Sequence, residues 1–179
     1  MERYEMAELL RKKAGVSLEE ARAALYLAQD KRMPQGWPLA FFGMFRGRAD
    51  SPLRVCGYLK EQERRACAAD PNRLACALGQ AGFTAYDETM LAQASCILGL
   101  APADADFQLD VFTDGSLSDM FAIDVRFDQM SSDDVCASFK EGEGAVIMAQ
   151  LREWGIADER VSHVADMAFT RGLNLLADD

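Results

Sequence analysis

The chain has 179 residues, half of them hydrophobic and 27% charged, with a formal net charge of −10. This length and composition exclude a disordered chain and allow a packed core. The acidic balance also argues against extensive binding to nucleic acid, because phosphate contacts need clustered Lys and Arg side chains.

The charge is divided unevenly along the chain. Residues 1–82 contain 14 Lys/Arg and 10 Asp/Glu, a net charge of +4, whereas residues 83–179 contain 5 and 19, a net charge of −14. Opposite charges on two parts of one molecule attract each other. We therefore expect the basic part to lie against the acidic part.

The hydrophobic segments are too short to indicate a membrane protein. Residues Met1 to Glu5 do not begin a signal peptide, and the longest uncharged apolar run is Trp37 to Phe45. A membrane-spanning helix needs roughly 20 such residues. We expect a soluble, cytoplasmic protein without a membrane partner.

The cysteines have the spacing of neither a zinc site nor a disulfide framework. They form no C-x-x-C pair and are odd in number: Cys56, Cys67, Cys76, Cys96 and Cys136. We expect free thiols that are mostly buried, since an unpaired cysteine behaves as a small hydrophobic residue. No cofactor is predicted.

The first predicted elements are helical. A helix over about residues 2–13 ends at Gly15, and Ser17 with Glu20 forms a capping box for a second helix. Residues 30–37 have the composition of a loop. The apolar run that follows Pro38 predicts a short third helix over residues 38–45.

The segment Ala7–Leu25 contains paired motifs: Leu10-Arg11, the turn Ala14-Gly15-Val16-Ser17, Glu20-Ala21 and Ala24-Leu25. It resembles the UBA-like three-helix module at the N-terminus of elongation factor Ts and of the nascent-polypeptide-associated complex. The resemblance implies a small helical module over residues 1–48 that binds a protein partner through the first inter-helix loop and the third helix. It assigns partner binding to Ala14, Gly15, Val16, Leu39 and Phe42.

Further helices are predicted over residues 52–99. Ser51-Pro52 and Asp70-Pro71 each place a capping residue before a proline at the first helical position. The second of these helices ends near Gly82. Thr84 with Asp87 forms another capping-box pattern, which opens a helix that ends at Gly99.

The pattern changes to period two after residue 106. Apolar residues alternate with polar ones on both sides of Asp114-Gly115, which predicts a β-hairpin over residues 107–127. Helices over 132–140, 144–154 and 158–176 are expected to cover its apolar face. Residues 49–179 would then form one α+β domain, and the chain as a whole would be α+β and mostly helical. Because two strands make a poor sheet alone, strands from a second copy could complete it, which leaves a homodimer open.

The predicted hairpin places Asp110 and Asp124 opposite each other on its polar side. Opposed like charges are destabilising, and Arg126 or a hard cation could relieve them, with Asp106 and Asp128 at the far end of the same ribbon. Docking onto the basic N-terminal segment is the favoured explanation.

His163 is the single histidine of the chain and lies near Glu159 and Asp166 in the last predicted helix. A carboxylate at this spacing can orient an imidazole for acid–base work. An ordinary boundary histidine with a helical ion-pair partner is the favoured interpretation.

Two functions remain open. The favoured hypothesis is a non-catalytic protein that binds another protein, of unknown identity, because catalytic groups are scarce and the N-terminus resembles a binding module. The alternative is a small-ligand binder or an enzyme with an acidic site at Asp110, Asp124, Arg126 and His163.

Overall fold

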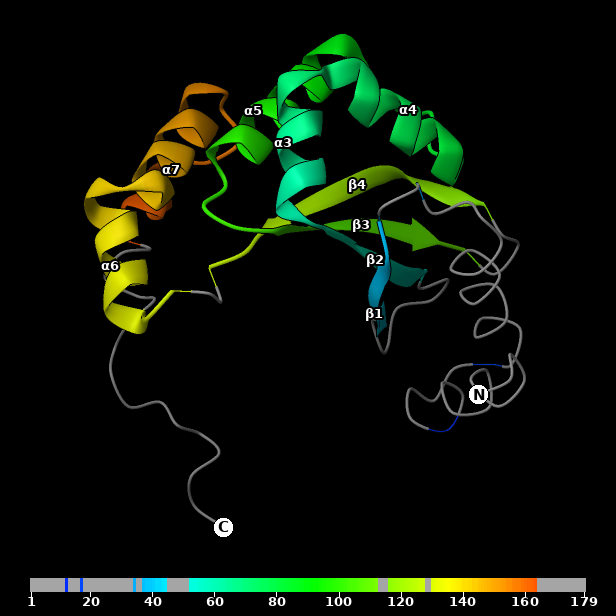
Figure 1. Cartoon of the computed structure of the whole chain (residues 1–179), viewed down its shortest axis with the longest axis horizontal. Helices are drawn as coiled ribbons and strands as arrows, with labels where there is room; N and C mark the ends of the chain where they lie inside the picture. Colours follow the sequence, from blue (N-terminus) through cyan, green and yellow to red (C-terminus); the bar gives the residue numbers. More distant parts are fainter. Residues whose placement is uncertain are drawn as a thin grey trace. The chain divides into compact units, whose positions relative to one another are not determined.

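The computed structural model describes residues 37–44, 52–112, 116–127 and 130–163, together with Lys12, Ser17 and Pro34. The described residues form an α+β fold with more helix than strand, as predicted (Figure 1). The predicted UBA-like helices before residue 37 lie outside the described residues.

The chain divides into two compact units. The first, here called the sheet unit, comprises Met1–Gly99 with Asp104–Val125, and the second, the helical unit, comprises Leu100–Ala103 with Arg126–Asp179. Each is described separately below.

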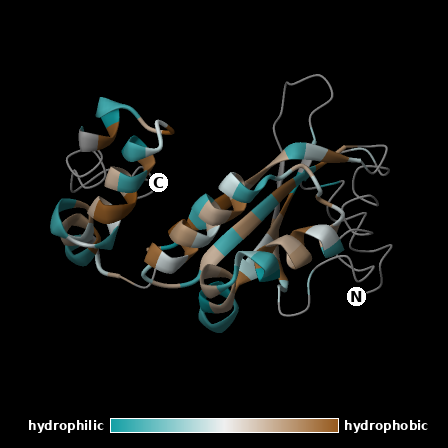
Figure 2. Cartoon of the chain, turned by 90° about the horizontal axis from the view of Figure 1, so that it is seen from above, coloured by the Kyte–Doolittle hydropathy of each residue, from teal (hydrophilic) through white to brown (hydrophobic). Residues whose placement is uncertain are grey.

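The sheet unit contains a four-stranded antiparallel sheet in the order β1-β2-β3-β4. Its strands are β1 (Leu39–Met44), β2 (Leu53–Leu59), β3 (Ala105–Val111) and β4 (Leu117–Val125). Hydrophobic and hydrophilic residues follow one another along the strands (Figure 2). This is the pattern of a sheet with one apolar and one polar face.

The two strands β1 and β2 correct the sequence analysis, which predicted helices in both places. In β2, Arg54, Cys56 and Tyr58 alternate with residues that face the opposite side of the sheet. That period of two is the strand period. The β1 segment is a short apolar run, which periodicity cannot assign to helix or strand. The two strands extend the hairpin within one chain, so the reason for expecting strands from a second copy disappears.

The predicted β-hairpin is confirmed as β3 and β4, although its strands begin and end a few residues away from the predicted limits. The pairing is regular from Ala105 with Val125 to Leu109 with Phe121. The next pair is Val111 with Leu117, so the register shifts there. Two residues of β3, from Leu109 to Val111, then lie opposite four of β4, from Phe121 to Leu117. The β4 strand therefore bulges at residues 118–120.

Three helices lie together on one side of the sheet (Figure 1). They are α3 (Glu61–Ala69), α4 (Pro71–Ala81) and α5 (Glu88–Leu100). Asp70 caps α4 by accepting a hydrogen bond from the Asn72 amide, and Gly82 ends it with a φ of 88°, which glycine adopts without strain. For α5, the cap is Asp87, which accepts from the Met90 amide at 2.7 Å, and not the predicted Thr84.

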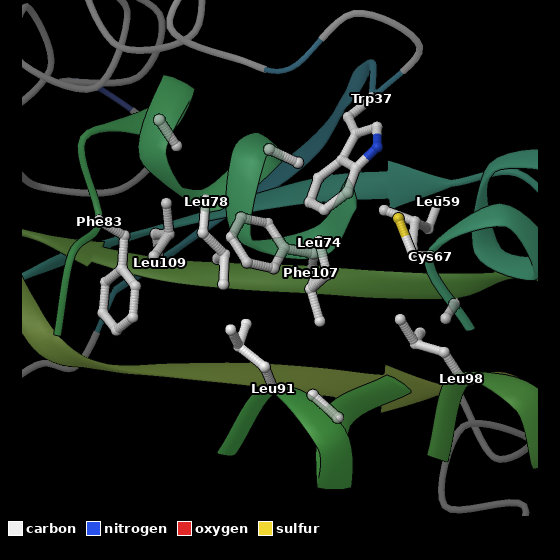
Figure 3. Packing of buried hydrophobic residues seen from close by; sticks show 14 residues of the cluster. Trp37, Leu59, Cys67, Leu74, Leu78, Phe83, Leu91, Leu98, Phe107 and Leu109 are labelled. Atoms are coloured by element: carbon white, nitrogen blue, oxygen red, sulfur yellow. The ribbon is translucent and has the colours of Figure 1, made fainter. Parts of the chain in front are cut away.

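The core lies between these helices and the sheet. Figure 3 shows side chains from α3, α4 and α5 pointing toward the apolar residues of β2 and β3. Trp37 also enters this core and contacts the ring of Phe107 edge-on, with centroids 4.9 Å apart. All described helical members of the core come from α3–α5. The described helices that cover this face of the hairpin precede it in the sequence, whereas the sequence analysis expected cover from the C-terminal helices.

A buried arginine links two of these helices. Arg64 of α3 is 3% exposed and donates a hydrogen bond to the carbonyl oxygen of Leu98 near the C-terminus of α5. Burial lowers the pKa of its guanidinium. The partial negative charge at a helix C-terminus favours a cation there, so Arg64 serves as a structural cap.

The helical unit contains α6 (Ser132–Glu141), α7 (Glu143–Glu153) and a 3₁₀ helix, η1 (Glu159–His163). The helices α6 and α7 were predicted, and Gly142 joins them. A Cβ at Gly144 would lie 2.9 Å from a ring atom of Phe139, so the two helices approach too closely there for a larger residue. This close packing accounts for the glycine at position 144.

Among the described residues, no helix has both the length and the apolar character needed to cross a membrane.

Candidate functional site

The side of the sheet that faces away from α3–α5 has the more unusual chemistry, and we call it the second face. Side chains alternate between the two sides along each strand, and paired residues of neighbouring strands lie on the same side. By this register the second face consists of Phe41, Arg54, Cys56, Tyr58, Asp106, Gln108, Asp110, Ala122 and Asp124.

The best-defined interaction on the second face joins β2 to β3. The guanidinium of Arg54 donates two hydrogen bonds to the carboxylate of Asp110, Nε to Oδ1 at 2.7 Å and Nη2 to Oδ2 at 2.9 Å. The two side chains are 30% and 13% exposed. This hydrogen bonding raises the pKa of Arg54 above its ordinary value. Such two-point pairing is the strongest geometry for this type of contact.

This ion pair corrects the predicted opposition of Asp110 and Asp124. Asp110 lies opposite Arg54, and the residue opposite Asp124 is Asp106. Pairing of Asp110 with Asp124 would centre the turn on residue 117, whereas Leu117 is already the first residue of β4 and pairs with Val111. The structure therefore contains a like-charge pair, with one of its two members different from the prediction.

The two opposed carboxylates differ in their surroundings. Asp124 is exposed and accepts a hydrogen bond from the side-chain amide of Gln108. Asp106 is 6% exposed and makes a further interaction of its own. Beside them, the Tyr58 hydroxyl donates to the carboxylate of Asp104, just before β3. Each carboxylate thus has a polar contact, and that of Asp110 is an ion pair with Arg54.

Cys56 lies at the centre of the second face and is fully buried. Burial, followed by the negative charges of Asp124 and Asp106, raises the pKa of its thiol to about 12. A nucleophilic cysteine needs the opposite surroundings, with a nearby cation that stabilises the thiolate. Cys56 is therefore a structural thiol.

A cation site needs several ligands that converge on one point, and the described residues contain no such cluster. Across the described ranges, no three His, Cys, Asp or Glu side chains converge as metal ligands would. Asp128, which the sequence analysis placed near the far end of the ribbon, lies outside the described residues.

The remaining residues of the predicted polar site are not part of the described sheet. Arg126 follows β4, belongs to the helical unit, is half-buried and has an interaction of its own. His163 is the last residue of η1 and is exposed. The described part of that segment is a 3₁₀ helix, whereas the sequence analysis predicted a long α-helix.

The residues predicted to bind a protein partner are only partly described. Ala14, Gly15 and Val16 lie outside the described residues. Leu39 and Phe42 belong to strand β1 and not to a third helix, and Leu39 packs against Val55 and Val111. The predicted third helix is therefore wrong at these two residues, and their part in partner binding stays a prediction.

Sequence reasoning missed two contributors to the second face. Arg54 was assigned to a helix, although its alternation with Cys56 and Tyr58 is a signal for a strand. Phe41 was assigned to the short helix over residues 38–45, and its side chain is 47% exposed in strand β1. An aromatic side chain this exposed is a candidate contact residue, because large apolar side chains usually become buried.

No protein-family model, curated protein or solved structure matches this chain.

Proposed function

We propose that this chain is a non-catalytic protein that binds another protein through the second face of its sheet, and that the partner presents a basic surface. The observation behind this proposal is the charge of that face. Three aspartates, Asp106, Asp110 and Asp124, lie on it, and Asp124 is exposed. The ion pair of Arg54 accounts for one of them.

The exposed ring of Phe41 supports the same proposal, because it adds an apolar contact to the charged ones. It pairs with Cys56, so its ring lies on the second face, at the β1 margin of the sheet. Binding energy at protein interfaces concentrates in a few residues, and aromatic side chains are enriched among them. An exposed aromatic ring on the same face as the exposed carboxylate of Asp124 suits a partner that has both an apolar pocket and Lys or Arg side chains.

The charge complementarity predicts how binding responds to salt. Electrostatic attraction between opposite surfaces mainly accelerates association and weakens as ionic strength rises. Affinity for the partner should therefore fall with added salt through a slower association rate.

An enzyme or small-ligand binder with an acidic site has less support. The buried thiol of Cys56 is held protonated, Asp110 is engaged by Arg54, and Asp124 accepts from Gln108. These contacts account for the two aspartates of that site, and Arg126 and His163 are not part of the described sheet. A UBA-like module with Ala14, Gly15 and Val16 remains a second, separate proposal for partner binding, and it rests on the sequence resemblance.

The test compares what four forms of the full-length protein retain from a lysate, measured by quantitative mass spectrometry. They are the unmodified chain, Asp124→Lys, Phe41→Ser and the control Glu141→Lys. Glu141 is exposed at the end of α6, so this control makes the same change in net charge away from the sheet.

Basic proteins should be retained by the unmodified chain and the control but lost by the other two variants. When these basic proteins are purified, they should bind the unmodified chain and the control more tightly than the other two variants. Equal retention by all four forms would rule out the second face as the binding surface.

A further inference from the structure

The open edge of the sheet at β4 suggests how a partner could bind. β4 is the last strand in the order, and no described residue pairs with its outer side. Its outward backbone N–H and C=O groups can therefore pair with an added strand, as happens when extended peptides join a sheet edge.

The two halves of β4 differ as templates for an added strand. The bulge at residues 118–120 disturbs the first half, and there the Met120 amide bonds to the Ser118 hydroxyl at 3.2 Å. Bulges and local hydrogen bonds of this kind protect an edge from pairing. From Phe121 to Val125 every residue has a regular partner in β3. This second half presents a straight edge, which we call the regular edge.

The side chains of the regular edge define what an added strand would meet. Phe121 and Ile123 pack against the core beneath the helices. Ala122 and Asp124 alternate with them on the second face, and Asp124 is exposed. A strand paired with this edge would continue both patterns, because neighbouring residues across a sheet share a face. Its side chains would alternate between apolar, next to Ile123, and basic, next to Asp124.

We propose that the regular edge of β4 takes up an extended segment of the partner in which apolar residues alternate with Lys or Arg. This proposal rests on the proposed function, since it names the form in which the basic partner binds. The segment would become a fifth strand. A Lys or Arg beside Asp124 would also offset the repulsion between Asp124 and Asp106.

The opposite edge of the sheet does not fit such a segment. The β1 strand, Leu39–Met44, contains no charged residue, and its register shifts between Leu39 and Phe41. A basic segment gains no charge pairing from the residues of that strand. The charge pattern therefore distinguishes the two edges.

The experiment uses the full-length protein and four short synthetic peptides. The first alternates lysine and valine, and the second has the same composition with the lysines and valines in separate blocks. The third replaces lysine by glutamate in the alternating order. The fourth is the alternating peptide with N-methyl groups on alternate residues, which removes backbone donors and keeps the side chains.

Binding is measured by fluorescence anisotropy, and the bound site is located by amide hydrogen exchange. The alternating peptide should bind and slow exchange within residues 121–125. The other three peptides should bind at least about tenfold more weakly, which corresponds to 1.4 kcal/mol. Asp124→Asn should weaken the alternating peptide, whereas the control Glu141→Gln should not.

Two results would overturn strand addition. One is that the block or N-methylated peptide binds as tightly as the alternating peptide and loses affinity in Asp124→Asn. The peptides would then bind to the acidic second face and not to the backbone of the edge. The other is no binding by any basic peptide, or protection at β1 in place of β4. The proposed function fails separately, if the charge and Phe41 variants retain the same proteins as the unmodified chain.

Discussion

The two faces of the sheet differ in the contacts that bury their side chains. The face under α3–α5 is closed by apolar side chains from these helices and from the sheet, including Leu74, Leu78 and Phe107. The second face buries Cys56, Asp106 and Gln108 among ionic and hydrogen-bonded neighbours. Stability should therefore depend mainly on the first face. Substitutions on the second face should affect charge and binding more than folding.

The largest expected difference in the free energy of unfolding is between two variants that each remove one aromatic ring, one from each face. Phe107→Ala leaves a cavity beside Trp37 and should lower the free energy of unfolding by about 3–5 kcal/mol. Phe41→Ala removes a half-exposed ring and should change it by less than about 1 kcal/mol. Urea denaturation of both variants provides the measurement. An equal loss for both would mean that the second face is packed as tightly as the first.

The buried thiols provide a second comparison, through pH. Burial raises the pKa of Cys67, in the apolar core, to about 11, and that of Cys56 to about 12. In the unfolded chain a thiol titrates near 9.0. Above that pH the unfolded chain releases protons that the folded chain keeps, so stability falls as pH rises. Each thiol should contribute a slope of about 1.4 kcal/mol per pH unit.

The fall attributable to Cys67 should extend to about pH 11 and that of Cys56 to about pH 12. Urea denaturation of the unmodified chain, Cys56→Ala and Cys67→Ala in buffers between pH 9 and 11 isolates each contribution from other titrating groups. Each variant should lose one such slope. A variant that keeps the full slope would show that its thiol is not held protonated. In the folded protein a thiol reagent should modify the exposed Cys76 well before either buried thiol.

The ion pair of the second face can be compared with an exposed pair of the same geometry. Asp110→Asn breaks the pairing with Arg54 and should cost about 1–2 kcal/mol, because both side chains are largely buried. Arg73 and Glu63 also form two hydrogen bonds, at 3.0 and 2.8 Å, but Arg73 is 52% exposed.

Glu63→Gln should therefore cost less than about 1 kcal/mol, since solvent screens exposed pairs. Thermal or urea unfolding of the two variants, side by side, measures the difference. A cost for Glu63→Gln as large as that for Asp110→Asn would show that burial does not strengthen the pair on the sheet.

Local signals in the sequence were sufficient for the helices that begin at a cap and for the hairpin. Asp70-Pro71 and Gly82 mark both ends of α4, and the alternation around residues 107–125 identifies β3 and β4. The strands β1 and β2 were missed. The β1 segment is apolar throughout, and Ser51-Pro52 resembles the start of a helix although a proline can also precede a strand.

The second face could be predicted only in part, because it depends on pairing between distant residues. Asp110 and Asp124 were identified as members of one polar face, and they do lie on it. Their partners were not, since Arg54 is 56 positions before Asp110 and β4 begins at Leu117, earlier than a pairing of Asp110 with Asp124 allows. A pattern within one strand shows which side a residue faces, and it does not show which residue lies opposite.

The smallest expected effect concerns the like-charge pair. Asp124→Asn removes the charge opposite Asp106, while its side-chain carbonyl can still accept the hydrogen bond from Gln108. Relief of the repulsion should raise the free energy of unfolding by about 0.2–0.5 kcal/mol at low ionic strength. Because Asp124 is exposed, added salt should reduce this gain. Urea denaturation at two salt concentrations tests both points. A loss of stability at low salt would instead mean that the hydrogen bond from Gln108 to a charged acceptor outweighs the repulsion, and the second face would then be stabilised by the same carboxylate that we propose for binding.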